Sequence, residues 1–419
     1  MRGKMGKRIQ SLISTLLSKK KMAGDFGWNL GASLASTLAM QVILLPFLGR
    51  RYDSNTYGYI LTFYSIANTI VLTCGNTLNN VRLIRNSTYK SENVTGDYPV
   101  LLIVLATIGV IATYIATRIN SATAFAGVLL GIYCLFAVLR TYGEVANRLV
   151  IDYRKNFIVY VGLGIGNLIG ILPLLFIKNT DLWVIPFITG EIVSVLILLF
   201  STKIYYEPIK KTHLFWGTVG REGILLSTTL ITNVVNYLDR LLLLPILGGT
   251  AVSAYTVATF FGKSVAILMN PISSVLLSYY SSENYVMTRK RFWRINGLVI
   301  VMSGVFYLAS ILLGRWVSGL FYPTIIEEAK PYLLIGNAAA IINVTANMVH
   351  PSVLKYASLK WQIVLKLVHG FIYIIGGSFA AKTGGLRYFC YAALLAACVN
   401  LVLQFIIGDL ALKEPRSDD

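Results

Sequence analysis

Long apolar runs recur along the whole chain, with short polar segments between them. Each run is about 20 residues long, the length that an α-helix needs to cross roughly 30 Å of hydrocarbon. We therefore expect an all-α membrane protein with twelve transmembrane helices. The predicted spans are 26–48, 57–80, 98–117, 122–142, 157–177, 182–202, 222–247, 251–279, 295–313, 329–350, 361–380 and 386–408.

The segment before the first span has an amphipathic pattern instead. Its apolar residues follow helical spacing between Arg8 and Lys21, and basic residues stand at both ends. We predict that residues 1–25 form a basic amphipathic segment on the cytoplasmic membrane surface. A signal peptide is the alternative, but the following apolar run lacks a small-residue cleavage site.

Lysine and arginine in the short loops indicate the orientation of the spans. With the N-terminus in the cytoplasm, the cytoplasmic segments hold 25 of these residues and the outer loops hold 8. This bias predicts that both termini are cytoplasmic. It also explains most of the net charge of +19, so the charge does not indicate a nucleic-acid partner.

A short motif occurs twice, and it divides the chain into two halves. The run LLPFLG at residues 44–49 recurs as LLPILG at residues 243–248, at an offset of 199. Six spans separate the copies, so both cross the membrane in the same direction, as in parallel repeats. We expect an N-lobe (26–202), a cytoplasmic linker (203–221), a C-lobe (222–408) and a cytoplasmic tail (409–419), with a cleft between the lobes.

The repeat also aligns polar residues at intervals of four along the first helix of each lobe. Residues three and four apart share one helix face, so each set forms a polar stripe, which we expect to line the cleft. The stripes are Asn29, Ser33, Thr37 and Gln41 in the first half, and Thr228, Thr232, Asn236 and Arg240 in the second.

Several charged residues fall within spans, where topology does not explain them. The basic ones are Arg140, Arg240, Lys263 and Lys366, and Asp239 precedes Arg240. A charge in a spanning helix costs about 2.5–3.5 kcal/mol on insertion scales, so such residues usually face a cavity or a partner. These residues are therefore candidates for a functional site.

The segments LLPFLGRRYDSNTYG and NYLDRLLLLPILGGTAVSAYTVA resemble the oligosaccharide flippases of polysaccharide biosynthesis. These Wzx-type proteins belong to a superfamily with the MATE drug exporters and the lipid II flippase. The resemblance implies a V-shaped transporter of two six-helix lobes that works by alternating access. It would move undecaprenyl-pyrophosphate-linked oligosaccharides from the cytoplasmic to the outer leaflet of the bacterial plasma membrane.

In such a protein Arg240 is the first candidate for the pyrophosphate, because a guanidinium matches phosphate oxygens in bidentate fashion. A structural ion pair is the alternative. Lys263, at the middle of its span, would contact the same group, and Asn236, Gln41 and Thr37 would line the cleft. Lys366 is a further cargo candidate, although it could instead extend to the cytoplasmic interface.

Two acidic residues are candidates for coupling to H⁺ or Na⁺. Asp239 could take up the ion or neutralise a basic residue of another helix. Glu191 has no basic residue nearby in sequence, so it is either neutral or paired across helices. Arg140 and Glu144 form an i,i+4 pair at the inner end of a span, which favours a role as an interfacial anchor.

Motifs for other functions are missing. The chain has no Gly-rich phosphate loop and no HExxH, so we expect neither ATP hydrolysis nor another enzyme activity, and no cofactor. Four cysteines lie in apolar stretches without the spacing of a zinc site, so no metal is expected. The outer segment 314–328 is too short for a glycosyltransferase or polymerase domain.

The first span has no acidic group, which disfavours a MATE-type exporter of cationic drugs. That exporter and a lipid II flippase are the alternatives to the oligosaccharide flippase. The partners we expect are the lipid-linked oligosaccharide, membrane lipids and the polysaccharide polymerase machinery. A monomer suffices for such a cleft.

Overall fold

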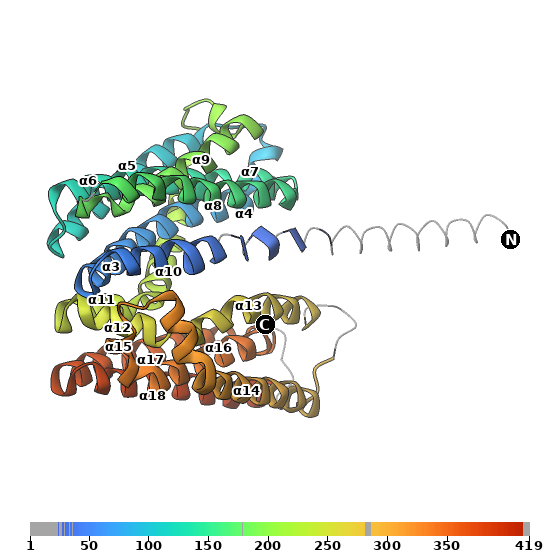
Figure 1. Ribbon diagram of the computed structural model, residues 1–419. Helices are drawn as coiled ribbons and strands as arrows, with labels where there is room; N and C mark the ends of the chain where they lie inside the picture. The colour runs from blue at the N-terminus through green and yellow to red at the C-terminus, as the bar shows by residue number, and fades with distance from the viewer. Residues whose placement is uncertain are drawn as a thin grey trace. The chain divides into compact units, whose positions relative to one another are not determined.

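The computed structural model describes residues 37–177, 179–280 and 286–413, together with several positions between 24 and 35 (Figure 1). Within these residues the chain is helical and contains no β-strand, which confirms the predicted all-α class. The amphipathic segment predicted near the N-terminus and the polar positions Asn29 and Ser33 lie outside the described residues.

The helices of the first half include two short π-helical and two 3₁₀ segments. They are η1 (Ala39–Leu44), α2 (Leu45–Arg51), α3 (Ser54–Val71), η2 (Leu72–Asn76), α4 (Thr77–Ser91), α5 (Asp97–Ile119), α6 (Ala124–Gly143), α7 (Val145–Leu149), α8 (Tyr153–Phe176), η3 (Thr180–Val184), α9 (Ile185–Ser201) and η4 (Ile204–Tyr206).

The second half continues the same architecture. Its elements are α10 (Phe215–Asn236), α11 (Leu238–Leu247), α12 (Gly249–Ala258), α13 (Phe260–Tyr280), α14 (Arg289–Phe321), α15 (Ile326–Ala329), η5 (Lys330–Tyr332), α16 (Leu333–Tyr356), α17 (Leu359–Phe371), η6 (Ile372–Gly376) and α18 (Gly377–Ala411).

Eight helices among the described residues are long and apolar enough to cross a membrane, or up to nine if the bent pair α10 and α11 is one span. The chain is therefore a multi-pass membrane protein. The eleventh and twelfth predicted spans count here as one helix, but the backbone is non-helical at Gly384 and Gly385 between them. The eighth is divided between α12 and α13, and the first lies partly outside the described residues.

The contacts within the chain define two compact units, which we call unit 1 and unit 2. Unit 1 comprises Met1–Leu44 and Ile66–Val234, and unit 2 comprises Leu45–Ser65 and Val235–Asp419. Each unit thus includes a segment from the other half of the chain. The lobe boundaries expected from the repeat remain a prediction.

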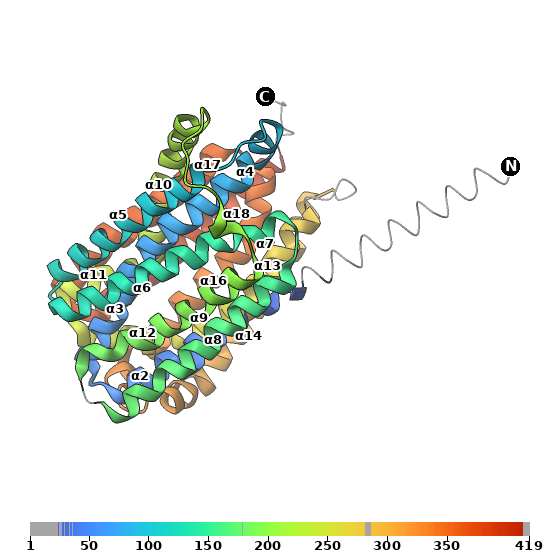
Figure 2. The same ribbon diagram turned by 90° about the horizontal axis from the view of Figure 1, so that it is seen from above.

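In unit 1, α5, α6, α9 and α8 lie side by side in that order (Figures 1 and 2). In unit 2, α16 is central and packs against α13, α14 and α18. The apolar core at this point joins α13, α14 and α16. It contains Val265, Met269, Val299, Val344 and Met348.

The two glycines of the repeated motif have different local roles. Gly248 ends α11 with φ +81°, a backbone conformation that favours glycine. Gly49 instead lies within α2, where a Cβ atom would stand 2.7 Å from the Tyr322 ring. The motif therefore serves to end a helix in one copy and to admit an aromatic ring in the other.

Helices α3 and α12 approach so closely within unit 2 that their backbones touch. A Cβ atom on Gly58 would lie 1.9 Å from the backbone oxygen of Gly249, and one on Gly249 would lie 2.1 Å from that of Asn55. Small residues allow such crossings between membrane helices. The Ser253 hydroxyl donates a hydrogen bond to the Ser54 carbonyl at the same crossing.

Candidate functional site

A polar cavity of about 310 Å³ lies within unit 2. Its walls come from α10 to α13, α16, the α17 and η6 segment, and α18. The lining residues are Val235, Asn236, Asp239, Tyr255, Thr259, Lys263, Ala266, Ala340, Asn343, Val344, Asn347, His350, Leu365, Lys366, His369, Tyr373, Asn400 and Gln404.

A break in the seventh predicted span places two of these residues at the cavity. The axes of α10 and α11 differ by 59°, and only Tyr237 separates the two helices. Asn236 ends α10, and Asp239 lies in the first turn of α11. The amino-terminal end of a helix favours negative charge, so the break gives the carboxylate a suitable environment.

Asp239 and Lys263 form an ion pair at the wall of this cavity. The distance from Lys263 Nζ to Asp239 Oδ2 is 2.7 Å. The second carboxylate oxygen accepts a hydrogen bond of 2.9 Å from the Arg240 backbone nitrogen. The Asp239 side chain is 10% exposed and that of Lys263 is 41% exposed, so the lysine is the more accessible partner. This contact with a basic residue of another helix is the one that the second alternative for Asp239 describes, and a role of Asp239 in ion coupling remains a prediction.

Arg240 does not line this cavity, although sequence reasoning gave it first place. Successive helical residues point about 100° apart, so Arg240 faces away from the side of Asp239. Its Nη1 donates a 2.9 Å hydrogen bond to Ser65 on α3, while its Nε is buried and has no hydrogen-bond partner in the described part of the chain. Burial raises the pKa of Tyr322 to about 12, and the nearby Arg240 charge opposes that shift.

Two further residues that the sequence suggested as cargo candidates, Lys366 and Asn236, line the cavity. Lys366, on α17, has no acidic partner among the described residues, unlike Lys263. Asn343, Asn347 and His350, at positions i, i+4 and i+7 of α16, also line the cavity.

Sequence reasoning missed five polar lining residues on α12, α17, η6 and α18, namely Tyr255, His369, Tyr373, Asn400 and Gln404. The Tyr255 and Tyr373 hydroxyls are 3.3 Å apart, and the Gln404 amide donates a 3.3 Å hydrogen bond to Asn400. His369 lies between Lys366 and Tyr373 in sequence. The spacing of Lys366, His369 and Tyr373 at i, i+3 and i+7 was a detectable signal of one polar face.

Thr37 and Gln41 belong to unit 1, where Gln41 lies within η1. Their part in a cleft between lobes remains a prediction, as does that cleft. No group of three His, Cys, Asp or Glu side chains suited to a metal ion occurs in the described parts of the chain. The thiols of all four cysteines are free.

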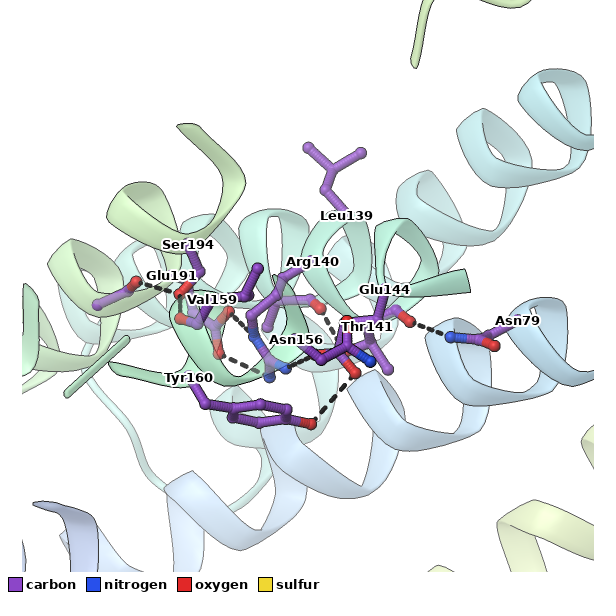
Figure 3. A network of polar contacts seen from close by, with 12 residues as sticks. Asn79, Leu139, Arg140, Thr141, Glu144, Asn156, Val159, Tyr160, Glu191 and Ser194 are labelled. Atoms are coloured by element: carbon purple, nitrogen blue, oxygen red, sulfur yellow. Dashed lines mark hydrogen bonds and ion pairs between the residues drawn. The ribbon is translucent and has the colours of Figure 1, made fainter. Parts of the chain in front are cut away.

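Glu191 lies in unit 1, where it has a basic partner from another helix (Figure 3). Its carboxylate accepts hydrogen bonds from Arg140 Nε at 2.5 Å and from Arg140 Nη2 at 3.1 Å. Arg140 also pairs with Glu144, as their i,i+4 spacing predicted. The partner of Glu191 is 51 residues away in sequence, so no local pattern could identify it.

The fold is similar to those of known membrane transporters. It matches an inward-facing multidrug resistance MATE family transporter of the MOP superfamily with a TM-score of 0.62 at 12% identity, over 92% of this chain and 94% of that one. A Vibrio cholerae MATE transporter in a bent form matches with a TM-score of 0.58 at 12% identity, over 95% and 98% of the two chains.

The lipid II flippase MurJ in an inward closed conformation matches with a TM-score of 0.62 at 14% identity, over 95% of this chain and 86% of that one. No family model matches the sequence, and no curated protein matches it. At these identities the likeness concerns the fold alone. The chain therefore has the fold shared by MATE transporters and the lipid II flippase.

Proposed function

We propose that this protein is a flippase for undecaprenyl-pyrophosphate-linked oligosaccharides in the bacterial plasma membrane. It moves them from the cytoplasmic to the outer leaflet by alternating access, for surface polysaccharide synthesis. The observation that carries this proposal is the unit 2 cavity, in which Lys366, with no acidic partner among the described residues, lies among amides and hydroxyls.

The charges of the cavity favour an anionic cargo. Asp239 and Lys263 neutralise each other, which leaves Lys366 as the uncompensated cation of the lining. An ammonium group donates charge-assisted hydrogen bonds to phosphate oxygens, which are about twice as strong as neutral ones. We assign the phosphate contact to Lys366, with Lys263 as the second cation that the cargo reaches.

The remaining polar groups suit a sugar. Asn236, Asn343, Asn347 and Asn400 offer both donors and acceptors, which match the hydroxyl groups of a carbohydrate. Because transport exposes an anion to the membrane potential, a negative interior assists its outward movement by about 2.3 kcal/mol per charge per 100 mV.

The same fold in MATE transporters favours drug export as the second candidate. A cationic drug needs an acidic group to bind, and Asp239 is the acidic residue of the cavity lining. Its ion pair with Lys263 occupies that charge, so we rank drug export below the flippase. A lipid II flippase would use the same phosphate contacts and differs in the sugar.

The test replaces Lys366 with Gln in cells whose surface polysaccharide depends on this protein. Loss of one charge-assisted contact costs about 1.5–3 kcal/mol, or about 10- to 150-fold in affinity for the cargo. We expect less surface polysaccharide and an accumulation of lipid-linked oligosaccharide on the cytoplasmic side.

The control is Lys382→Gln, a change at an exposed lysine outside the cavity lining. Normal surface polysaccharide in Lys366→Gln, at normal protein levels, contradicts the assignment. Hypersensitivity of a deletion strain to cationic dyes, with intact surface polysaccharide, favours the exporter. Accumulation of lipid II instead favours the lipid II flippase.

A further inference from the structure

Unit 1 contains a second group of buried charges, separate from the cavity of unit 2. Arg140 on α6 lies between two carboxylates, Glu144 at the end of α6 and Glu191 on α9 (Figure 3). The three side chains are 11%, 10% and 4% exposed. We call them the Arg140 triad. All three lie within helices that are apolar enough to span a membrane.

The two carboxylates are held differently. Glu191 receives two hydrogen bonds from the guanidinium, the bidentate arrangement that best stabilises an ionised carboxylate. Glu144 receives only one, from Arg140 Nη1. Its other oxygen accepts a 3.1 Å hydrogen bond from the Tyr160 hydroxyl on α8. Glu191 is therefore the ionic partner of Arg140, and Glu144 is the weaker partner.

The charges of the triad do not balance. One guanidinium stands against two carboxylates, so a fully ionised triad carries one excess negative charge. The free energy of burying an ionised carboxylate in the low-dielectric interior is far higher than that of burying the neutral acid. Two carboxylates that share one site therefore do not both stay ionised.

Among the residues that the structure describes, no neighbouring element supplies the missing cation. Arg82 on α4 binds Glu207 with both terminal nitrogens, and Arg148 on α7 donates to the Asn79 and Asn80 side chains.

The tyrosines near the triad are also committed to other contacts. Tyr142 accepts a hydrogen bond from Arg82, and the Tyr205 hydroxyl donates to the Leu139 carbonyl at 2.8 Å. Tyr160 on α8 does contact the triad, but its hydroxyl is a neutral hydrogen-bond donor and adds no positive charge. Binding of one proton would cancel the excess charge.

We propose that Glu144 is a proton-binding site, and that Glu191 remains ionised beside Arg140. The proton joins a Glu144 carboxylate oxygen to form the neutral acid, and the triad then has no net charge. This transfers the role of ion-coupling candidate from Glu191 to Glu144. The proposal concerns the triad alone, so it stands or falls independently of the cargo.

The test observes the side-chain carboxyl carbons directly. Full-length protein with carbon-13 in its glutamate side chains is placed in lipid bilayers at neutral pH, and NMR separates protonated from ionised carboxyls. In Glu144→Gln we expect one protonated signal to disappear while the ionised signal of Glu191 stays in place.

Glu191→Gln supplies a second measurement and covers the case in which Glu144→Gln fails to fold. It removes the excess charge, so Glu144 should change from protonated to ionised. The control Glu92→Gln, at an exposed residue beside His213, should remove one ionised signal only. Loss of an ionised signal in Glu144→Gln, or a Glu144 that is ionised already in the unmodified protein, overturns the proposal.

Discussion

The Ser253 hydroxyl donates a hydrogen bond to the backbone carbonyl of Ser54, and the two residues are 199 positions apart. That separation equals the offset between the two copies of the LLPxLG motif. Equivalent positions of the two halves of the chain therefore meet each other. The hydrogen bond supports the interpretation of the motif as part of an internal repeat.

The crossing beside these serines depends on the absence of side chains. We expect Gly58→Val to lower the stability by about 3 kcal/mol or more, at the upper end of overpacking costs, because its first side-chain atom meets the Gly249 backbone. Thermal unfolding in detergent measures the effect. The control is Gly223→Ala on α10, where a Cβ atom meets nothing within 4 Å. Equal melting temperatures for the two variants contradict the close approach.

The Asp239 and Lys263 side chains should contribute a measurable pair energy. Water reaches the lysine, so we expect a coupling of about 1 kcal/mol in a double-mutant cycle of Asp239→Asn and Lys263→Gln. The matched control is the exposed pair of Arg315 and Glu327, separated by 3.5 Å, whose coupling should be near zero. A coupling at Asp239 no greater than that of the control rules out a stabilising ion pair.

Arg240 and Lys366 should respond differently to replacement. Arg240→Gln removes the hydrogen bond to Ser65, so we expect a stability loss of about 1–3 kcal/mol. Lys366→Gln should leave the melting temperature almost unchanged and reduce cargo transport. Thermal unfolding and the level of lipid-linked oligosaccharide, measured on both variants, decide between the two roles. Reduced transport with normal stability in Arg240→Gln restores that residue as a cargo group.

Asp53, in the short turn between α2 and α3, should stabilise the protein to a degree that depends on pH. Asp53 Oδ2 accepts a 3.0 Å hydrogen bond from the Thr56 backbone nitrogen, and hydrogen bonds from Thr56 lower the pKa of Asp53. This stabilisation is complete above the unfolded carboxyl pKa of about 3.9 and is lost as pH falls through the lower folded-state value.

We therefore expect Asp53→Ala to cost about 1 kcal/mol at neutral pH, and the difference from the unmodified protein to shrink in acid. Melting temperatures of both proteins across this pH range measure it. A difference that is constant down to the lowest pH shows that the Asp53 charge does not stabilise the turn.

The sequence was sufficient to predict the helical class and most of the spans, because each span is defined by local hydropathy. Asn236, Asp239 and Lys263 could be singled out because their polarity conflicts with an apolar span, and all three line the unit 2 cavity. Their part in cargo or ion binding remains a prediction. The sequence did not show that Arg240 lies outside this cavity, because which face of α11 lines the cavity depends on how the neighbouring helices pack around it.

The partner of Glu191 could not be predicted for a related reason. Arg140 lies on α6 and Glu191 on α9, and only the packing of these helices brings the side chains together. Glu144 appeared to be a simple helical partner of Arg140. The structure adds that the same guanidinium also contacts Glu191, a contact that the i,i+4 spacing does not indicate.

The exchange of segments between unit 1 and unit 2 has a consequence for biosynthesis. Unit 1 ends at Val234, so the ribosome has already made residues 45–65 of unit 2 before unit 1 is complete. Gly58 emerges 191 residues before Gly249, the residue against which its helix packs. Helix α3 is therefore synthesised before the helix that it packs against. A nascent chain stopped before α12 should be a ready substrate for membrane chaperones and proteases.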